Sequence, residues 1–198
     1  MSALDELYKE IGSCQRCPLY ETALKAVPGE GPQDARVLFL GEAPGWHENQ
    51  QGRPFVGAAG KFLDELLSIA GLRRQDVYIT NVVKHWPPGN RDPQPSEVAA
   101  CDIWFQRQLE IITPMVIVTL GRYSLNKFFP GESISRIHGA ARRRDNTIYV
   151  NMYHPAAGLH QQSLRRVIEE DFRKLPAFLA EAEKAAKPED KPQQLSMF

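Results

Sequence analysis

Four side chains of the metal-binding type lie in two distant parts of the chain. Cys14 and Cys17 are three positions apart, and His85 and Cys101 flank a loop that can bring both of them to the same place. Thiolate and imidazole ligands suit zinc or an iron–sulfur cluster, and the number of ligands alone does not separate the two. The pattern indicates a four-ligand site. A thiol redox motif, or a buried Cys101 with a structural His85, is the alternative.

A second pattern is rich in glycine and proline. Residues 41–45 read Gly-Glu-Ala-Pro-Gly, and Glu48, Phe55 and the small residues 57–60 follow. Glycine lets the backbone approach a planar or phosphate ligand closely, and the next helix can point its amino terminus at that ligand. The segment matches neither a Walker loop nor a dinucleotide fingerprint. Phe55 can stack on a base or cover its own core.

Asn81 and His154 each follow an apolar run, at places where strands are expected to end. Asparagine presents a donor and an acceptor side by side, which suits an amide-like edge, and histidine can donate to a developing oxyanion. Either residue can also be an ordinary structural hydrogen-bonding group. Basic residues gather in two stretches: Arg136, His138, Arg142, Arg143 and Arg144, then His160, Arg165 and Arg166. They predict phosphate contacts if they lie on the rim of the site, and a solvated turn if they do not.

Short apolar runs bounded by turn residues predict the elements that position these side chains. Four runs are typical of buried parallel strands: residues 36–40, 77–83, 115–120 and 147–152. Helices are expected at residues 4–11, around 62–69, at 96–112 and at 163–182. A further short helix is expected to end near residue 129. The alternation predicts a three-layer α/β/α fold with a central four-stranded parallel sheet. Ligands of such folds lie beyond the carboxyl ends of the strands, which selects residues 41–45, Asn81 with the loop after it, 121–122 and 154–156.

The composition fits one globular domain. The chain has 198 residues, 24 basic and 24 acidic side chains, no net charge, 42% hydrophobic residues and three cysteines. We expect a domain at residues 1–183 and a flexible, charged tail at 184–198. We expect a cytoplasmic protein for three reasons. The number of cysteines is odd, no apolar run approaches the ~20 residues of a membrane span, and the start of the chain has no signal-peptide pattern. Zero net charge gives no overall indication of nucleic-acid binding.

Five sequence blocks together resemble the family-four uracil-DNA glycosylases, which carry an iron–sulfur cluster. The blocks are, in order, residues 41–45, 52–57, 79–84, 87–91 and 154–156, within a match that runs from Leu7 to Phe178. The resemblance implies a uracil-DNA glycosylase-like fold and a DNA repair enzyme that flips uracil out of DNA, hydrolyses its N-glycosidic bond and leaves an abasic site. The implied substrates are single- and double-stranded DNA that contains uracil. We expect a monomer associated with the nucleoid.

The resemblance also implies roles for residues of these blocks. Phe55 would stack on the flipped uracil, Asn81 would read its amide edge, and the backbone of Gly41 and Glu42 would line the same pocket. His154 would stabilise the uracil anion at its O2 atom as the bond breaks.

The attacking water needs a residue to position it. The best-known related family uses an aspartate where this chain has Ala43. The candidates for this task are Glu48 and Asn90, and Glu42 is also among the catalytic candidates. Leu159, just after the last block, resembles the apolar wedge that fills the gap left by a flipped base.

The resemblance implies a [4Fe-4S] cluster with an unusual ligand set: Cys14, Cys17, His85 and Cys101. His85 stands where the family normally has a fourth cysteine, and a histidine ligand is expected to raise the cluster potential. A site without a cluster is the alternative. A related group that traps uracil-DNA covalently has the same histidine, but its Arg-rich insertion is missing between Lys84 and Ser96, so we expect ordinary turnover. A cluster-bearing DNA-binding protein without turnover is the third hypothesis. Asn49 also departs from the family, which usually has an acidic residue there.

The last five residues, Gln194–Phe198, resemble the short motif by which bacterial repair and replication proteins bind the sliding clamp. Such a motif presents apolar anchors and a glutamine on a tether, from which a peptide can reach a pocket on another protein. An ordinary disordered chain end is the alternative.

Overall fold

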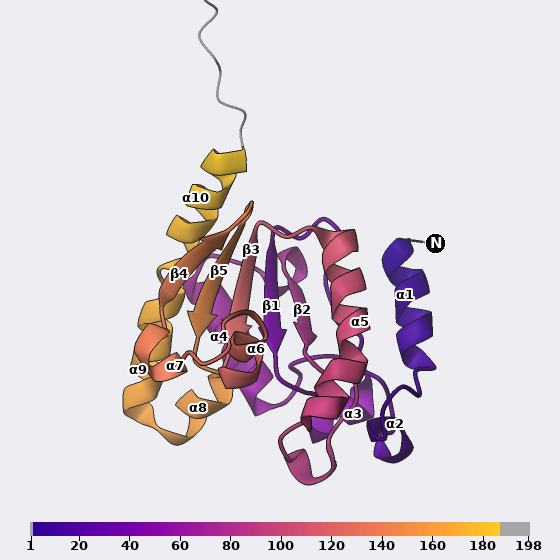
Figure 1. Ribbon diagram of the computed structural model, residues 1–198. Helices are drawn as coiled ribbons and strands as arrows, with labels where there is room; N and C mark the ends of the chain where they lie inside the picture. Colours follow the sequence, from indigo (N-terminus) through magenta and orange to yellow (C-terminus); the bar gives the residue numbers. More distant parts are fainter. Residues whose placement is uncertain (1, 187–198) are drawn as a thin grey trace, which may run out of the picture.

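A sheet of five strands forms the centre of the molecule. The computed structural model describes residues 2–186 (Figure 1). The strands are β1 (Val37–Gly41), β2 (Tyr78–Asn81), β3 (Val116–Leu120), β4 (Ala140–Arg144) and β5 (Thr147–Met152). Their order across the sheet is β2-β1-β3-β5-β4, and all neighbouring pairs are parallel except β4 and β5.

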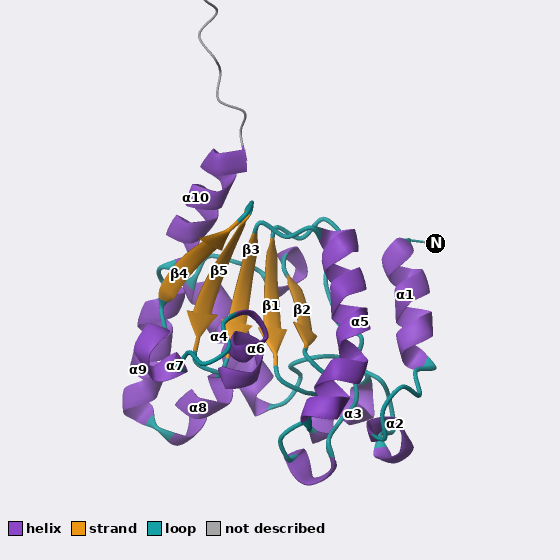
Figure 2. Cartoon of the chain, viewed as in Figure 1, coloured by secondary structure: helices purple, strands orange, loops and turns teal. Residues whose placement is uncertain are grey.

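Helices cover both faces of this sheet (Figure 2). They are α1 (Ala3–Gly12), α2 (Leu19–Thr22), α3 (Trp46–Gln51), α4 (Ala58–Ile69), α5 (Pro95–Ile112), α6 (Arg122–Phe128), α7 (Ile134–Ile137), α8 (Pro155–His160), α9 (Gln162–Phe172) and α10 (Leu175–Ala186), with 3-10 turns η1 (Arg74–Asp76) and η2 (Pro88–Asn90). Alternate residues of β1 face different layers. Val37 and Phe39 belong to the core shared with α4, α9 and α10, whereas Leu38 and Leu40 belong to the core shared with α1 and α5. In residues 2–186, no helix is long and apolar enough to cross a membrane.

The three-layer fold and the four predicted parallel strands are confirmed, but the sheet has a fifth strand. β4 contains three adjacent arginines, and of its residues only Ala141 is even partly buried. An edge strand with its side chains in solvent has no apolar alternation, so the sequence pattern does not reveal it. β4 forms because it pairs with β5 across a two-residue turn, in which Asp145 takes a left-handed backbone conformation (φ 52°).

The prediction of a single closing helix at residues 163–182 is wrong, because the structure has two helices there, α9 and α10. Pro176 stands at the start of α10. Proline has no N–H, and its ring clashes with the carbonyl group four residues earlier, so a continuous helix cannot pass through it. α10 continues to Ala186, beyond the expected domain boundary at 183. The predicted clamp-binding residues 194–198 lie outside the described residues.

The four parallel strands end at one edge of the sheet, and the loops that carry the sequence motifs leave from that edge. Gly41, at the end of β1, pairs in register with Asn81, at the end of β2. β3 ends just before Gly121, and β5 ends two residues before His154. Segments distant in the sequence therefore meet at this edge, where parallel α/β sheets bind their ligands.

α4 begins so close to the loop before it that one position in its first turn must be glycine. A Cβ atom on Gly60 would lie 1.9 Å from the carbonyl oxygen of Phe55, which is a backbone atom and cannot rotate away. We expect Gly60→Ala to lower the free energy of unfolding by about 1–3 kcal/mol, as overpacking does. Urea denaturation measures this change. Gly12→Ala is the matched control, because nothing lies within 4 Å of a Cβ at that position. Equal unfolding free energies for the two variants would contradict the close approach.

Candidate active site

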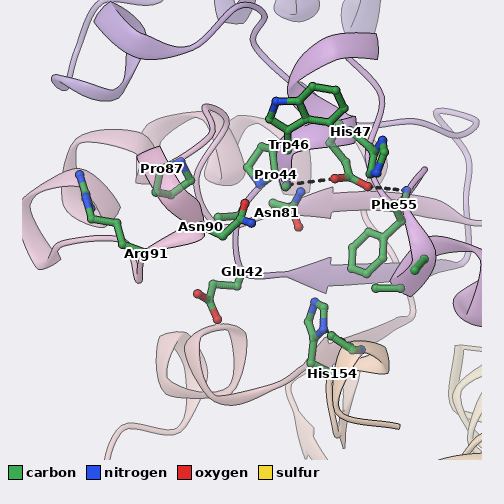
Figure 3. A pocket seen from close by; sticks show the side chains of 17 residues that line it. Glu42, Pro44, Trp46, His47, Phe55, Asn81, Pro87, Asn90, Arg91 and His154 are labelled. Atoms are coloured by element: carbon green, nitrogen blue, oxygen red, sulfur yellow. Dashed lines mark hydrogen bonds between the residues drawn. The ribbon is translucent and has the colours of Figure 1, made fainter. Parts of the chain in front are cut away.

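A pocket of about 550 Å³ opens at the carboxyl edge of the sheet (Figure 3). It brings together six of the predicted site residues: Glu42, Glu48, Phe55, Asn81, Asn90 and His154. Gly41 lies directly against two of them. A Cβ atom at Gly41 would lie 2.3 Å from Oδ1 of Asn81 and 2.7 Å from the ring of Phe55. Only glycine at this position lets the two side chains approach each other.

Phe55 is held in a backbone conformation that is uncommon for its residue type. Its φ is 49°, in the left-handed region, and its side chain is buried. Arg74 donates to the carbonyl oxygens of Phe55, at 3.1 Å, and of Pro54, at 2.6 Å. These bonds fix the conformation against its intrinsic preference. The ring faces the imidazole of His154 at a centroid distance of 5.5 Å and an angle of 27°, so the pocket has an aromatic wall.

The carboxylate of Glu48 ties two segments of the pocket together. Its Oε2 atom accepts a hydrogen bond from the N–H of Gly45 at 3.0 Å. Its Oε1 atom accepts from the N–H groups of Val56 and Gly57, both at 2.8 Å. The first bond caps α3, and the other two hold the loop that follows Phe55. These bonds give Glu48 a structural task, and its role in orienting water stays a prediction.

Asn81 carries an acceptor without a partner. The residue is 2% exposed, and its Oδ1 atom has no hydrogen bond among the described residues. A buried polar atom left unpaired costs about 1–3 kcal/mol, and this oxygen is available to a donor that a bound molecule brings. The backbone of Asn81 is fixed, because its carbonyl oxygen accepts from Nζ of Lys84 at 2.7 Å.

The imidazole of His154 is neutral at pH 7. Burial lowers its pKa to about 4, and the negative charge of Glu48 opposes this shift. Nδ1 accepts a hydrogen bond from the N–H of Ala156 at 3.2 Å. A neutral ring that accepts at Nδ1 carries its proton on Nε2. His154 therefore offers an uncharged N–H donor.

Glu42 and Asn90 add polar groups to the pocket wall. Burial raises the pKa of Glu42 to about 7, the negative charge of Asp92 adds to the shift, and Arg122 opposes it. Glu42 is thus divided between its acid and base forms near neutral pH. Asn90 has a left-handed backbone (φ 55°), and its Oδ1 atom accepts from Nε1 of Trp86 at 2.7 Å.

Leu159 lies beside the pocket with its side chain in solvent. It is 40% exposed and follows the pocket residue Ala156 by one turn of α8. Residues three apart on a helix share one side, so Leu159 is on the side that meets the pocket. Its role as a wedge stays a prediction.

The predicted basic stretches do not line the pocket. Arg142 and Arg144 lie over the ring of Phe129, and Arg142 pairs with Glu132 at 2.7 Å. These arginines are engaged in local contacts at the edge of the sheet, on and beside β4. Arg91, from one of the sequence blocks, is the arginine that lines the pocket.

The predicted metal ligands lie on the face of the sheet that α1 and α5 cover. Three cysteines belong to one buried apolar cluster: Cys14, Cys17 and Cys101. His85 is 6% exposed. Sγ of Cys14 accepts a hydrogen bond from Nε1 of Trp104 at 3.1 Å, and Sγ of Cys101 accepts from the backbone N–H of Lys84 at 3.2 Å. The second bond places the segment of His85 next to Cys101.

By residue type, three thiols and an imidazole are ligands that zinc or an iron–sulfur cluster accepts. This donor set is soft, buried and supplied with N–H groups that donate to sulfur, which are contacts that tune cluster thiolates. Burial raises the pKa of Cys101 to about 11 and lowers the pKa of His85. Within residues 2–186, no group of three or more His, Cys, Asp and Glu side chains is arranged to hold a metal ion.

Sequence reasoning missed three residues that shape the site: Trp46, Arg74 and Lys84. Arg74 left no local signal, because its contacts with Phe55 join segments far apart in the chain. Lys84 is fully buried, and its Nζ also donates to Thr80 at 2.7 Å and to Gln108 at 2.8 Å. A lysine that directly follows an apolar strand is a signal that could have revealed it.

The chain resembles known enzymes along most of its length. A model of the Uracil DNA glycosylase superfamily matches residues 28–183. Together with the fold and the pocket, this match defines the class as that of the uracil-DNA glycosylases. The chain is 47% identical over 184 residues to a type-4 uracil-DNA glycosylase of Archaeoglobus fulgidus. The aligned residues cover 88% of this chain and 92% of the relative. The chain is 45% identical over 185 residues to the type-4 enzyme of Sulfurisphaera tokodaii, with coverage of 88% and 84%. A type-5 uracil-DNA glycosylase of Thermus thermophilus is 41% identical over 116 residues, about half of each chain. The chain belongs to the type-4 uracil-DNA glycosylase family.

The neutral state of His154 can be followed by NMR. We expect its ring resonances to stay constant from about pH 8 to about pH 5 and to shift near pH 4, because charging a desolvated imidazole is unfavourable. In the unfolded chain the ring titrates near pH 6.5. As the pH falls from about 6.5 to about 4, the unfolded state binds the extra proton, so the contribution of His154 to stability decreases. The His154→Asn variant lacks this imidazole, so the ring resonance that is missing from its spectrum is assigned to His154. A midpoint near pH 6.5 in the folded protein would contradict the neutral ring.

Proposed function

We propose that this protein releases uracil from DNA by hydrolysing the N-glycosidic bond, and that it leaves an abasic site. The observation that carries the proposal is the buried, unpaired Oδ1 atom of Asn81, in a pocket with the aromatic ring of Phe55 and the neutral donor of His154. Uracil is a flat ring with an N–H group between two carbonyl groups, and these are the partners that the pocket is missing. The type-4 relatives carry the name uracil-DNA glycosylase, which supports the same assignment.

Recognition of the base depends on Phe55 and Asn81. The ring of uracil stacks on Phe55, the Oδ1 atom of Asn81 accepts from its N3–H, and the amide nitrogen of Asn81 donates to its O4. Cytosine has no proton at N3 and carries an amino group in place of O4, so both contacts fail. A site whose buried polar groups are left unpaired by the wrong base rejects that base strongly.

Cleavage of the bond leaves negative charge on the departing uracil. The Nε2–H group of His154 donates to the O2 atom, where part of this charge develops. An uncharged donor that is already in position stabilises the transition state without a proton transfer.

A water molecule must then attack the sugar carbon. We assign the orientation of this water to Glu42 and Asn90, both in the pocket wall. Glu42 has a carboxylate with a pKa of about 7, whereas both oxygens of Glu48 already accept backbone N–H groups. Glu48 then serves the reaction by holding the pocket in shape.

The DNA substrate must present its uracil outside the base stack, because the bond is inaccessible inside a duplex. Leu159, exposed beside the pocket, fills the gap that the extruded base leaves in a duplex. Single-stranded DNA has no such gap. The proposed substrates are therefore single- and double-stranded DNA that contains uracil, and the proposed site of action is the nucleoid.

A [4Fe-4S] cluster belongs to this proposal, with Cys14, Cys17, His85 and Cys101 as its ligands. When bound, the cluster supplies a rigid cross-link between the N-terminal segment, the loop after β2 and α5, and it takes no part in bond cleavage. The N–H groups of Trp104 and Lys84 donate to the sulfur atoms of Cys14 and Cys101, which are contacts of the kind that orient and tune metal ligands.

A monomeric state and binding to the sliding clamp through residues 194–198 complete the proposal. Both rest on the sequence, and the clamp motif is supported by its place at the end of a charged, proline-bearing segment.

Release of free uracil from oligonucleotides tests the proposed reaction. We expect the wild type to release uracil from single- and double-stranded DNA without added metal. Asn81→Ala and His154→Ala should slow release by about 100-fold or more, because each removes a contact with the base or with the developing anion. Leu159→Ala should slow release from duplex more than from single strands. Leu24→Ala, at a 63% exposed leucine outside the pocket wall, is its matched control.

Three outcomes would contradict this reaction. Cluster-loaded wild type that releases no uracil would refute it. A protein–DNA adduct that survives denaturing electrophoresis would favour the covalent uracil-trapping relative. Tight binding of uracil-DNA without release would favour a binding protein without turnover.

Metal analysis tests the cluster. We expect the purified protein to be brown and to contain iron and acid-labile sulfide in equal amounts. Cys101→Ser and His85→Ala should lower the iron content, because each removes a ligand, and they should lower the melting temperature, because the cross-link weakens. His85→Cys should retain the cluster, and His160→Ala, at an exposed histidine, is the control. Zinc without sulfide, or iron that is unaffected by these substitutions, would overturn the ligand assignment.

A further inference from the structure

Trp46 is the most exposed aromatic side chain in the described part of the chain, at 51%. Its indole lines the pocket, yet none of the contacts assigned to uracil uses it. In Figure 3, Trp46 and His154 lie on opposite sides of the pocket, and Asn81 lies between them. Asn81 and Phe55 are buried, whereas the indole is half in solvent. Trp46 therefore stands at the mouth of the pocket, on its solvent side.

The backbone that presents Trp46 is fixed at both ends of its helix. Trp46 is the first residue of α3, and Glu48 accepts the N–H of the preceding Gly45 at 3.0 Å. Near the other end of α3, Oδ1 of Asn49 accepts the N–H groups of residues 24 and 25 at 2.8 and 3.3 Å. Asn49 stands where the family usually has an acidic residue, and its amide oxygen accepts these two hydrogen bonds. A helix held in this way presents the indole with little loss of conformational freedom on binding.

Extrusion of a uracil also exposes the base next to it. That neighbour loses a stacking partner when uracil leaves the strand, and in single-stranded DNA no complementary base holds it in place. Aromatic side chains stack on bases of any sequence, because every base has a flat face. Trp46 lies on the pocket that takes the uracil, so the adjacent nucleotide is the part of the strand that comes nearest to it. This continuity with the pocket favours a nucleobase over a protein partner.

We propose that Trp46 forms a second nucleobase subsite, in which its indole stacks on the base adjacent to the extruded uracil. This inference rests on the proposed function, because the adjacent base is defined by uracil in the pocket. The subsite contributes most to single-stranded DNA, where Leu159 has no gap to fill.

A binding cycle on uncleavable DNA tests the subsite. The probe is a single-stranded oligonucleotide with one 2′-fluoro-2′-deoxyuridine, with its neighbours intact, or with the 5′ or the 3′ neighbour replaced by an abasic tetrahydrofuran. We expect the loss of one of these bases to weaken binding by the wild type about tenfold. Trp46→Ala should weaken binding to the intact probe by a similar factor and show no further loss when the base is removed. Trp46→Phe should keep part of the effect, and Tyr20→Ala, at an exposed aromatic residue outside the pocket, should behave as the wild type.

Two results would overturn the subsite. One is a wild type whose affinity is unchanged by removal of either neighbouring base. The other is a loss on base removal that is equal in the wild type and in Trp46→Ala, which would mean that the indole contacts something else. A parallel assay of uracil release from the cleavable oligonucleotide separates this failure from failure of the proposed function, because the wild type would still release uracil if only the subsite were wrong.

Discussion

The buried carboxylate of Glu48 holds the pocket together. It accepts three backbone N–H groups from two segments of the chain, and hydrogen bonds to an ionised group are roughly twice as strong as those between neutral groups. Without it, these N–H groups would lose their acceptor in a largely buried place. The start of α3 and the loop that follows Phe55 depend on this anchor, while Arg74 fixes the left-handed conformation of Phe55 itself. The negative charge of Glu48 also limits how far the pKa of His154 falls.

The sequence predicted the parts of the fold that leave a local pattern. Buried parallel strands are continuous apolar runs, so four strands were found, whereas β4 has solvent-facing arginines and is specified by its pairing with β5. Asn81 and His154 meet in one pocket because the loops at the carboxyl ends of strands converge, which the strand pattern predicts. The bonds of Arg74 to the loop of Phe55 could not be predicted, because they join distant segments and leave no periodic signal. The anchoring role of Glu48 was also not predicted, because bonds from one side chain to the N–H groups of nearby loops have no periodic pattern.

Lys84 connects the pocket with the predicted metal ligands. Its ammonium group has no exposure to solvent and donates to Thr80, Asn81 and Gln108, while its backbone N–H donates to Cys101. Burial lowers its pKa to about 7, because the charged group has given up its water. One residue therefore contacts both Asn81, the proposed base-reading residue, and Cys101, a predicted metal ligand. The two regions are parts of one hydrogen-bonded unit.

The hydrogen bonds that Arg74 donates to the carbonyl groups of Pro54 and Phe55 have a consequence for the mechanics of the DNA. A pocket whose aromatic wall is fixed by internal bonds does not adapt its shape to different sequence contexts. The nucleic acid must then supply the bending and twisting that bring a uracil to the enzyme, and these are easiest at flexible steps. Differences in repair rate between genomic contexts would therefore map the local stiffness of the DNA itself.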